Sequence, residues 1–149
     1  HLIFEITESI FMDGHDEHLA RIRALRQAGC QIAIDDFGTG FSALNYLRRY
    51  PMDLVKIDRS FILHIPEHVQ DRLLLQGLIR MVHNLGMQLV VEGIERDEQQ
   101  AFIANEGCAY TQGYLFSKPL AWDLLLDYLQ RQTTRTAANV GEARTSLLI

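Results

Sequence analysis

The chain has 149 residues, of which 48% are hydrophobic and 22% charged, and its formal net charge is -5. This composition is typical of a globular domain with a core, and it excludes binding to nucleic acid through a general basic surface, so we expect no DNA partner. The two cysteines, Cys30 and Cys108, lack CxxC spacing, which favours reduced thiols. No apolar run is long enough to cross a bilayer, so we expect no membrane contact from this segment.

Apolar runs and amphipathic patterns alternate along the chain, with short connections between them. Strands are predicted at residues 2–7, 30–35, 53–58, 87–93 and 109–114. Helices are predicted at residues 16–28, 41–50, 66–85, 97–106 and 122–129, the last with Trp122 and its leucines in the core. This alternation predicts an α/β fold with parallel strands, which are apolar enough to be covered on both faces. We expect one domain over residues 1–130, followed by a polar, disordered tail at residues 131–149.

Polar side chains gather where each predicted strand ends. The carboxyl ends of parallel strands lie on one face of a β/α barrel, or along one edge of a doubly wound sheet, so these side chains converge in either architecture. In chain order they are Glu5, Asp35, Asp36, Lys56, Asp58, Glu92, Glu95 and Gln112. Clustered carboxylates repel one another unless cations neutralise them, and Mg²⁺ or Mn²⁺ is the hard ion that oxygen ligands prefer.

The adjacent aspartates, Asp35 and Asp36, are suited to holding two neighbouring metal ions. Such a pair of ions catalyses hydrolysis of phosphate esters by stabilising the attacking and leaving oxygens. Lys56 is then a candidate to orient the nucleophilic water or to offset charge on the phosphate. The alternatives from the residues alone are a turn and helix cap for the two aspartates and a solvated charge for Lys56. Glu8 and Glu95 also fit surface positions, and Gln112 fits a buried amide in the core.

Five ordered motifs, "EITES", "DDFGTGFSAL", "LVKIDRSFI", "VVEGIE" and "TQGYLFSKPL", resemble the EAL domain, a bacterial phosphodiesterase that hydrolyses cyclic di-GMP to linear pGpG. The resemblance implies a TIM-like barrel with two Mg²⁺ or Mn²⁺ ions. The family's signature glutamate and a metal-binding asparagine lie upstream of "EITE", and a whole barrel takes roughly 250 residues. We therefore expect the C-terminal part of the domain, an incomplete barrel that lacks its N-terminal strands and is impaired as a catalyst without the intact parent protein.

The resemblance also implies roles for individual residues. The implied metal ligands are Glu5, Asp35, Asp36 and Glu92, and the implied catalytic groups are Lys56, Glu92, Glu95 and Gln112. Lys56 contacts the catalytic water in this reading, while Glu95 and Gln112 support the network of metal and water. Glu8 steadies a loop linked to dimerisation and to control of activity, so a homodimer is expected through that loop. The loop residues are Phe37, Gly38, Thr39, Gly40, Phe41 and Ser42.

A second function stays open beside hydrolysis. Some EAL-like domains lose catalytic groups and serve as cyclic di-GMP receptors or as scaffolds for protein interaction. The residue that stands at the upstream glutamate position would distinguish the two. In both cases the resemblance implies a cytoplasmic location, or a membrane-anchored parent whose domain faces the cytosol, because cyclic di-GMP is an intracellular signal.

Overall fold

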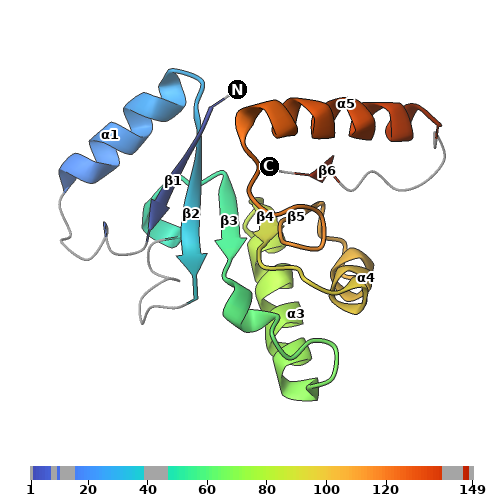
Figure 1. Ribbon diagram of the computed structural model, residues 1–149. Helices are drawn as coiled ribbons and strands as arrows, with labels where there is room; N and C mark the ends of the chain where they lie inside the picture. Colours follow the sequence, from blue (N-terminus) through green and yellow to red (C-terminus); the bar gives the residue numbers. More distant parts are fainter. Residues whose placement is uncertain (1, 8–9, 11–15, 39–46, 139–145, 148–149) are drawn as a thin grey trace.

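The computed structural model describes residues 2–7, 10, 16–38, 47–138 and 146–147 (Figure 1). The strands are β1 (Ile3–Thr7), β2 (Gln31–Phe37), β3 (Leu54–Ile57), β4 (Gln88–Val91), β5 (Tyr110–Thr111) and β6 (Ser146–Leu147). The helices are α1 (Asp16–Gln27), α3 (Val69–Asn84), α4 (Asp97–Asn105) and α5 (Trp122–Ala138), with a short 3-10 helix η2 (Arg59–Phe61). Among the helices so described, none is both long and apolar enough to cross a lipid bilayer.

The strands form one parallel sheet in the order in which they occur along the chain, from β1 to β6. A doubly wound sheet reverses its strand order at a switch point, and the described strands contain no such reversal. Each strand is instead followed by its nearest neighbour, which is the arrangement of a segment of a β/α barrel. The predicted parallel α/β fold is confirmed, and the strand order favours the barrel over the open sheet.

The two faces of the sheet carry different side chains, because successive residues of a strand point to opposite sides. The outer face is the one that packs on α1, α3 and α4, and it forms the main core with the buried Ile34, Val55 and Val91. The inner face has a much smaller apolar cluster, made of Ala33, Leu54, Val90 and the partly buried Tyr110. Polar groups at the carboxyl end of the sheet therefore belong to the inner face.

Strand β1 is more exposed than its sequence predicts. Its residues Ile3 and Phe4 are 37% and 40% exposed, so the prediction that the strands are covered on both faces holds for β2, β3 and β4 but is wrong for β1. The reason is its position, since β1 pairs with β2 alone among the described strands.

Helix α5 differs from its predicted form in two ways. It continues to Ala138, so residues 131–138 are helical and the predicted start of a tail at residue 131 is wrong. Polar residues such as Gln130 and Arg131 continue a helix readily when no glycine or proline stops it. Trp122 and Leu126 are 69% and 42% exposed, so the prediction that they lie in the core is also wrong. Figure 1 shows α5 as a long helix at one end of the molecule.

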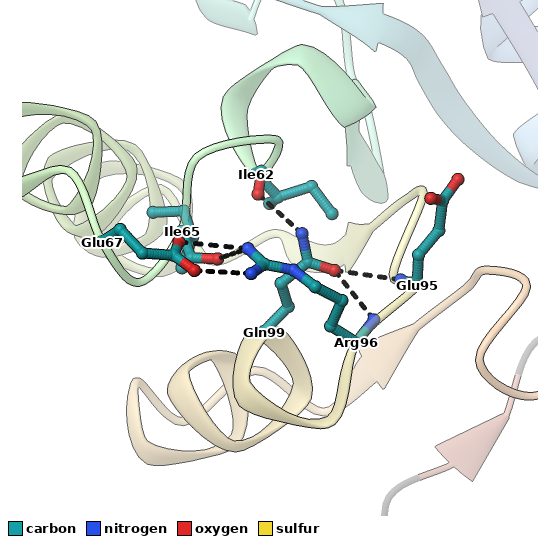
Figure 2. Close-up of polar contacts among 6 residues, drawn as sticks. All are labelled: Ile62, Ile65, Glu67, Glu95, Arg96 and Gln99. Atoms are coloured by element: carbon teal, nitrogen blue, oxygen red, sulfur yellow. Dashed lines mark hydrogen bonds and ion pairs between the residues drawn. The ribbon is translucent and has the colours of Figure 1, made fainter.

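Helix α4 begins at the predicted residue, Asp97. Asp97 is already helical, and the N-cap is Arg96, in an extended conformation. An ion pair joins this N-cap to the segment before α3 (Figure 2): Arg96 Nη1 lies 2.5 Å from Glu67 Oε1, and Arg96 Nη2 donates to the carbonyl oxygen of Ile65. The connection after β3 and the connection after β4 are therefore tied together.

The two cysteines are expected to differ in reactivity. Burial, with a smaller contribution from the charge of Glu106, raises the pKa of the Cys108 thiol from 9.0 to about 12, whereas Cys30 is only half-buried. At pH 8 this shift leaves Cys108 with about a thousandfold less thiolate than a thiol with a pKa of 9.0 would have. We expect a thiol reagent to label Cys30 in the folded chain and Cys108 only after unfolding. The single variants Cys30→Ala and Cys108→Ala assign the signals, and equal labelling rates would contradict the burial of Cys108.

The Arg96–Glu67 ion pair predicts a specific acid sensitivity. Hydrogen bonds from Arg96 lower the pKa of Glu67 from 4.5 to about 2, so the stabilisation is complete above pH 4.5 and is lost as the pH falls from 4.5 towards 2. We expect Glu67→Gln to show a shallower loss of stability in that window, measured by chemical unfolding at each pH. Both groups are exposed, so 1 M salt is expected to reduce the difference. Parallel stability curves for the two proteins at low salt would show that the pair contributes nothing.

Candidate metal centre

A buried lysine lies at the centre of the polar groups on the inner face. Lys56, on the central strand β3, has a side chain only 8% exposed, and its Nζ lies 2.8 Å from Glu5 Oε2, 2.9 Å from Asp35 Oδ1 and 3.0 Å from Glu92 Oε1. Burial alone would lower the pKa of Lys56, but the hydrogen bonds to these three carboxylates outweigh burial and raise it. The ammonium is therefore charged, and it joins β1, β2, β3 and the end of β4 at one point.

Three carboxylates form a cluster beside this lysine. Each of Asp35, Asp36 and Glu92 offers an oxygen, and these oxygens all lie within 4.8 Å of one another. Burial raises the pKa of Glu92, although Lys56 opposes the rise, and desolvation followed by the charge of Asp35 raises the pKa of Asp36. Burial is the largest cause in both cases, and the charges of neighbouring carboxylates add to it.

An irregularity in β2 brings both aspartates to the same place. The pairing of β2 with β3 shifts register between Ile34 and Phe37, and Asp36 has a φ of 54° in the left-handed region, which Asp tolerates better than most residues. A regular strand would turn Asp36 towards the outer core and Phe37 towards the inner face. The shift instead leaves Phe37 in the outer core, where it is 1% exposed, and leaves Asp36 beside Asp35.

The donor set of the cluster fits a divalent metal ion. Three carboxylate oxygens within 4.8 Å of one another are the hard ligands that Mg²⁺ and Mn²⁺ prefer. Glu5, the fourth predicted ligand, is brought to the same centre through Lys56, and its side chain is half exposed. The predicted convergence of Glu5, Asp35, Asp36, Lys56 and Glu92 is thus present in the structure.

A cleft of about 240 Å³ adjoins the cluster. Its lining includes four residues that the sequence placed at the strand ends: Asp58, Glu92, Glu95 and Gln112. It also includes residues that the sequence did not indicate: Arg59, Gly93, Gly113 and Tyr114. Glu95 faces Arg59, with Oε1 3.9 Å from Nη1. Gln112 is exposed, so the alternative of a buried core amide is wrong, and its position beside Glu92 favours a role in the site.

The predicted regulatory loop is described only at its start. Phe37 is the last residue of β2 and belongs to the core, which corrects its predicted place as the first residue of the loop. Gly38 follows with a φ of 96°, and a Cβ there would lie 2.5 Å from the ring of Phe61, so glycine is required. The other predicted members lie outside the described residues: Glu8, Thr39, Gly40, Phe41 and Ser42.

A larger depression of about 450 Å³ lies at the amino end of the sheet, beside Cys30 and Asp53. Two of its charged groups already satisfy each other, because Arg26 Nη2 donates to Asp53 Oδ1 at 2.7 Å and Arg26 Nε donates to Asp53 Oδ2 at 3.1 Å. Asp53 Oδ2 also accepts from the backbone N–H of Ile32. This pair therefore serves to hold α1 against the start of β3, and the carboxyl end of the sheet is the better candidate site.

The chain resembles known proteins throughout its described core. The family model of the EAL domain matches residues 1–119. The cyclic di-GMP phosphodiesterase NbdA of Pseudomonas aeruginosa is 43% identical over 129 residues, which are 87% of this chain and 16% of NbdA. The crystal structure of the EAL domain of Mycobacterium smegmatis DcpA has a TM-score of 0.82 and 35% identity, and the match covers 87% of this chain and 58% of that one.

A third likeness is to Klebsiella pneumoniae BlrP1, in a complex with manganese and cyclic di-GMP. Its TM-score is 0.73 at 33% identity, covering 78% of this chain and 30% of that one. The chain thus spans less than two thirds of each of these three proteins. The match of the family model to residues 1–119, together with this structural agreement, identifies the chain as a member of the EAL domain family.

Proposed function

We propose that a protein containing this chain hydrolyses cyclic di-GMP to linear pGpG with divalent metal ions, either Mg²⁺ or Mn²⁺, bound as a pair. The observation that carries the proposal is the cluster of Asp35, Asp36 and Glu92 around a buried lysine at the carboxyl end of a parallel sheet. NbdA, a relative at 43% identity, is a cyclic di-GMP phosphodiesterase, which supports the same substrate here.

In this proposal Asp35, Asp36, Glu92 and Glu5 would hold the metal ions. The ions, when bound, supply Lewis-acid polarisation of the phosphate and a nucleophilic water at neutral pH. The ammonium of Lys56 holds three of the carboxylates in place, because it lies within 3.0 Å of each, and it adds positive charge next to the phosphate. Glu95 and Gln112 line the adjoining cleft, where they are placed to orient water and substrate.

A homodimer through residues 37–42 is proposed from the family resemblance of the "DFGTG" segment. The buried Phe37 would then anchor the segment from within the core, and the residues that follow would supply the contact surface. A cytoplasmic location is proposed because the substrate is an intracellular signal in the family.

Glu92→Gln tests the function directly. We expect this variant to lose about a hundredfold or more of the hydrolysis rate, since it removes a charged ligand from the cluster. The assay follows pGpG by chromatography with Mn²⁺ and after chelation, for the 149-residue chain and for a longer polypeptide that contains it. Glu17→Gln, on the exposed face of α1, is the matched control and is expected to retain full activity.

The same assay separates catalysis from binding. If neither polypeptide produced pGpG while both bound cyclic di-GMP, the hydrolase proposal would be wrong and the receptor function would replace it. If the longer polypeptide alone produced pGpG, the carboxylate cluster would need groups from outside this chain.

Lys56→Met separates the role of the ammonium from that of the ligands. We expect hydrolysis to fall by about 10²-fold, because the positive charge at the phosphate is lost. Mn²⁺ binding, measured by calorimetry, is expected to persist, since the carboxylates of Asp35, Asp36 and Glu92 remain. Arg80→Met is the control, because Arg80 is exposed on α3 and lies outside both the cluster and the cleft. A Lys56→Met variant with wild-type turnover would remove Lys56 from the proposed mechanism.

A further inference from the structure

We propose that Gln99 is a positioning residue for the metal centre, because its buried amide holds the turn that carries Glu92 and Glu95 against the segment that follows β3. The inference rests on the proposed function, since it concerns the same carboxylates. Gln99 lies in the first turn of α4 and only 4% of it is exposed, although the sequence pattern alone does not distinguish it from the other polar residues of this helix.

The amide of Gln99 links two connections of the barrel (Figure 2). Its Oε1 accepts from the backbone N–H of Glu95 at 3.0 Å and from that of Arg96 at 3.1 Å. Its Nε2 donates to the carbonyl oxygen of Ile62 at 2.9 Å. The first contacts fix the turn between β4 and α4, and the last fixes that turn to the segment after η2. Removing the amide leaves the Ile62 carbonyl without its partner in a buried place, and the N–H groups of Glu95 and Arg96 without theirs in a partly buried one.

Contacts at Gly93 and Ile94 also restrict the turn that Gln99 holds. A Cβ at Gly93 would lie 2.4 Å from the Cβ of Arg59, so the turn touches η2 closely on one side. On the other side Ile94, which is fully buried, donates to the carbonyl oxygen of Gln112 at 3.0 Å and accepts from the N–H of Leu115 at 2.9 Å. Gln99 and these contacts therefore hold the same short turn, and a displacement of that turn moves its start, which is Glu92.

Glu92 is where such a displacement affects metal binding. Its backbone N–H donates to the carbonyl oxygen of Ile57, and its Oε1 lies 3.0 Å from Lys56 Nζ. Its carboxylate also belongs to the cluster with Asp35 and Asp36. Residues that orient metal ligands without binding the metal themselves typically weaken metal affinity by about 10–100-fold when they are substituted. Gln99 acts on Glu92 only through the turn between them, so we expect a loss of metal affinity at the lower end of that range.

Glutamine is suited to this position because it combines an acceptor and a donor on one planar group. Methionine has similar length and helix propensity but offers neither strong function. Glutamate keeps the acceptor for Glu95 and Arg96 but cannot donate to Ile62 when ionised. The two substitutions therefore separate the contact within the turn from the contact across to η2.

The test measures Mn²⁺ affinity of the 149-residue chain by calorimetry, with thermal unfolding alongside. We expect Gln99→Met to weaken Mn²⁺ binding about tenfold. The matched control is Ile103→Ala, one turn further along α4, where a fully buried side chain packs in the outer core. We expect this control to lower the melting temperature and to leave the Mn²⁺ affinity of the folded protein unchanged.

Wild-type affinity in Gln99→Met would overturn the inference, as would equal losses of affinity in Gln99→Met and Ile103→Ala. If Gln99→Met fails to fold, Gln99→Glu decides the matter, with weakened Mn²⁺ binding expected and unchanged binding contradicting the link to Ile62. If neither the wild-type chain nor a longer polypeptide that contains it bound Mn²⁺, the proposed function and this inference would be overturned together. If only the longer polypeptide bound Mn²⁺, the same variants are compared in that polypeptide. Wild-type binding with unaltered variants would overturn the inference alone.

Discussion

The structure of the site depends on one buried ammonium group. Lys56 lies on a central strand of a parallel sheet, where an unpaired charge would be costly, and three carboxylates from neighbouring strands surround it. The same carboxylates repel one another, so the lysine and the acidic groups each need the other. Because Asp36 adds a further carboxylate beside them, the balance remains negative, and a divalent cation bound there would offset it.

The division of the sheet into two faces allows this charge to exist beside a packed core. Apolar residues such as Ile34 and Val55 face α1 and α3, while the inner face holds only a small apolar cluster around Leu54. The register shift in β2 serves both faces at once, since it keeps Phe37 in the core and leaves Asp36 with Asp35. A left-handed residue in the strand is the conformational cost of that arrangement.

The connections after β3 and β4 are held together by polar groups of α4 as well as by apolar packing. Arg96 pairs with Glu67 on the outside, and Gln99 bridges backbone groups on the inside. The exposed pair adds a pH-dependent contact, whereas the buried amide fixes the turn next to Glu92. This arrangement explains how a residue without contact to the carboxylates acts on the metal centre.

The sequence by itself determined the parallel α/β fold and most of the candidate site. Alternating apolar runs and helical patterns located the strands from β1 to β5, and polar residues at strand ends marked Glu5, Asp35, Asp36, Lys56 and Glu92, because parallel strands must bring their carboxyl ends together. Only the tertiary structure decided which groups Lys56 pairs with, how β2 changes register, and that Gln99 is buried between two connections. These features depend on contacts between segments far apart in the chain, and local pattern carries no information about such contacts. The exposure of Trp122 and the extension of α5 to Ala138 could not be predicted for the same reason. An amphipathic pattern predicts a helix but does not specify which other segment covers its apolar face.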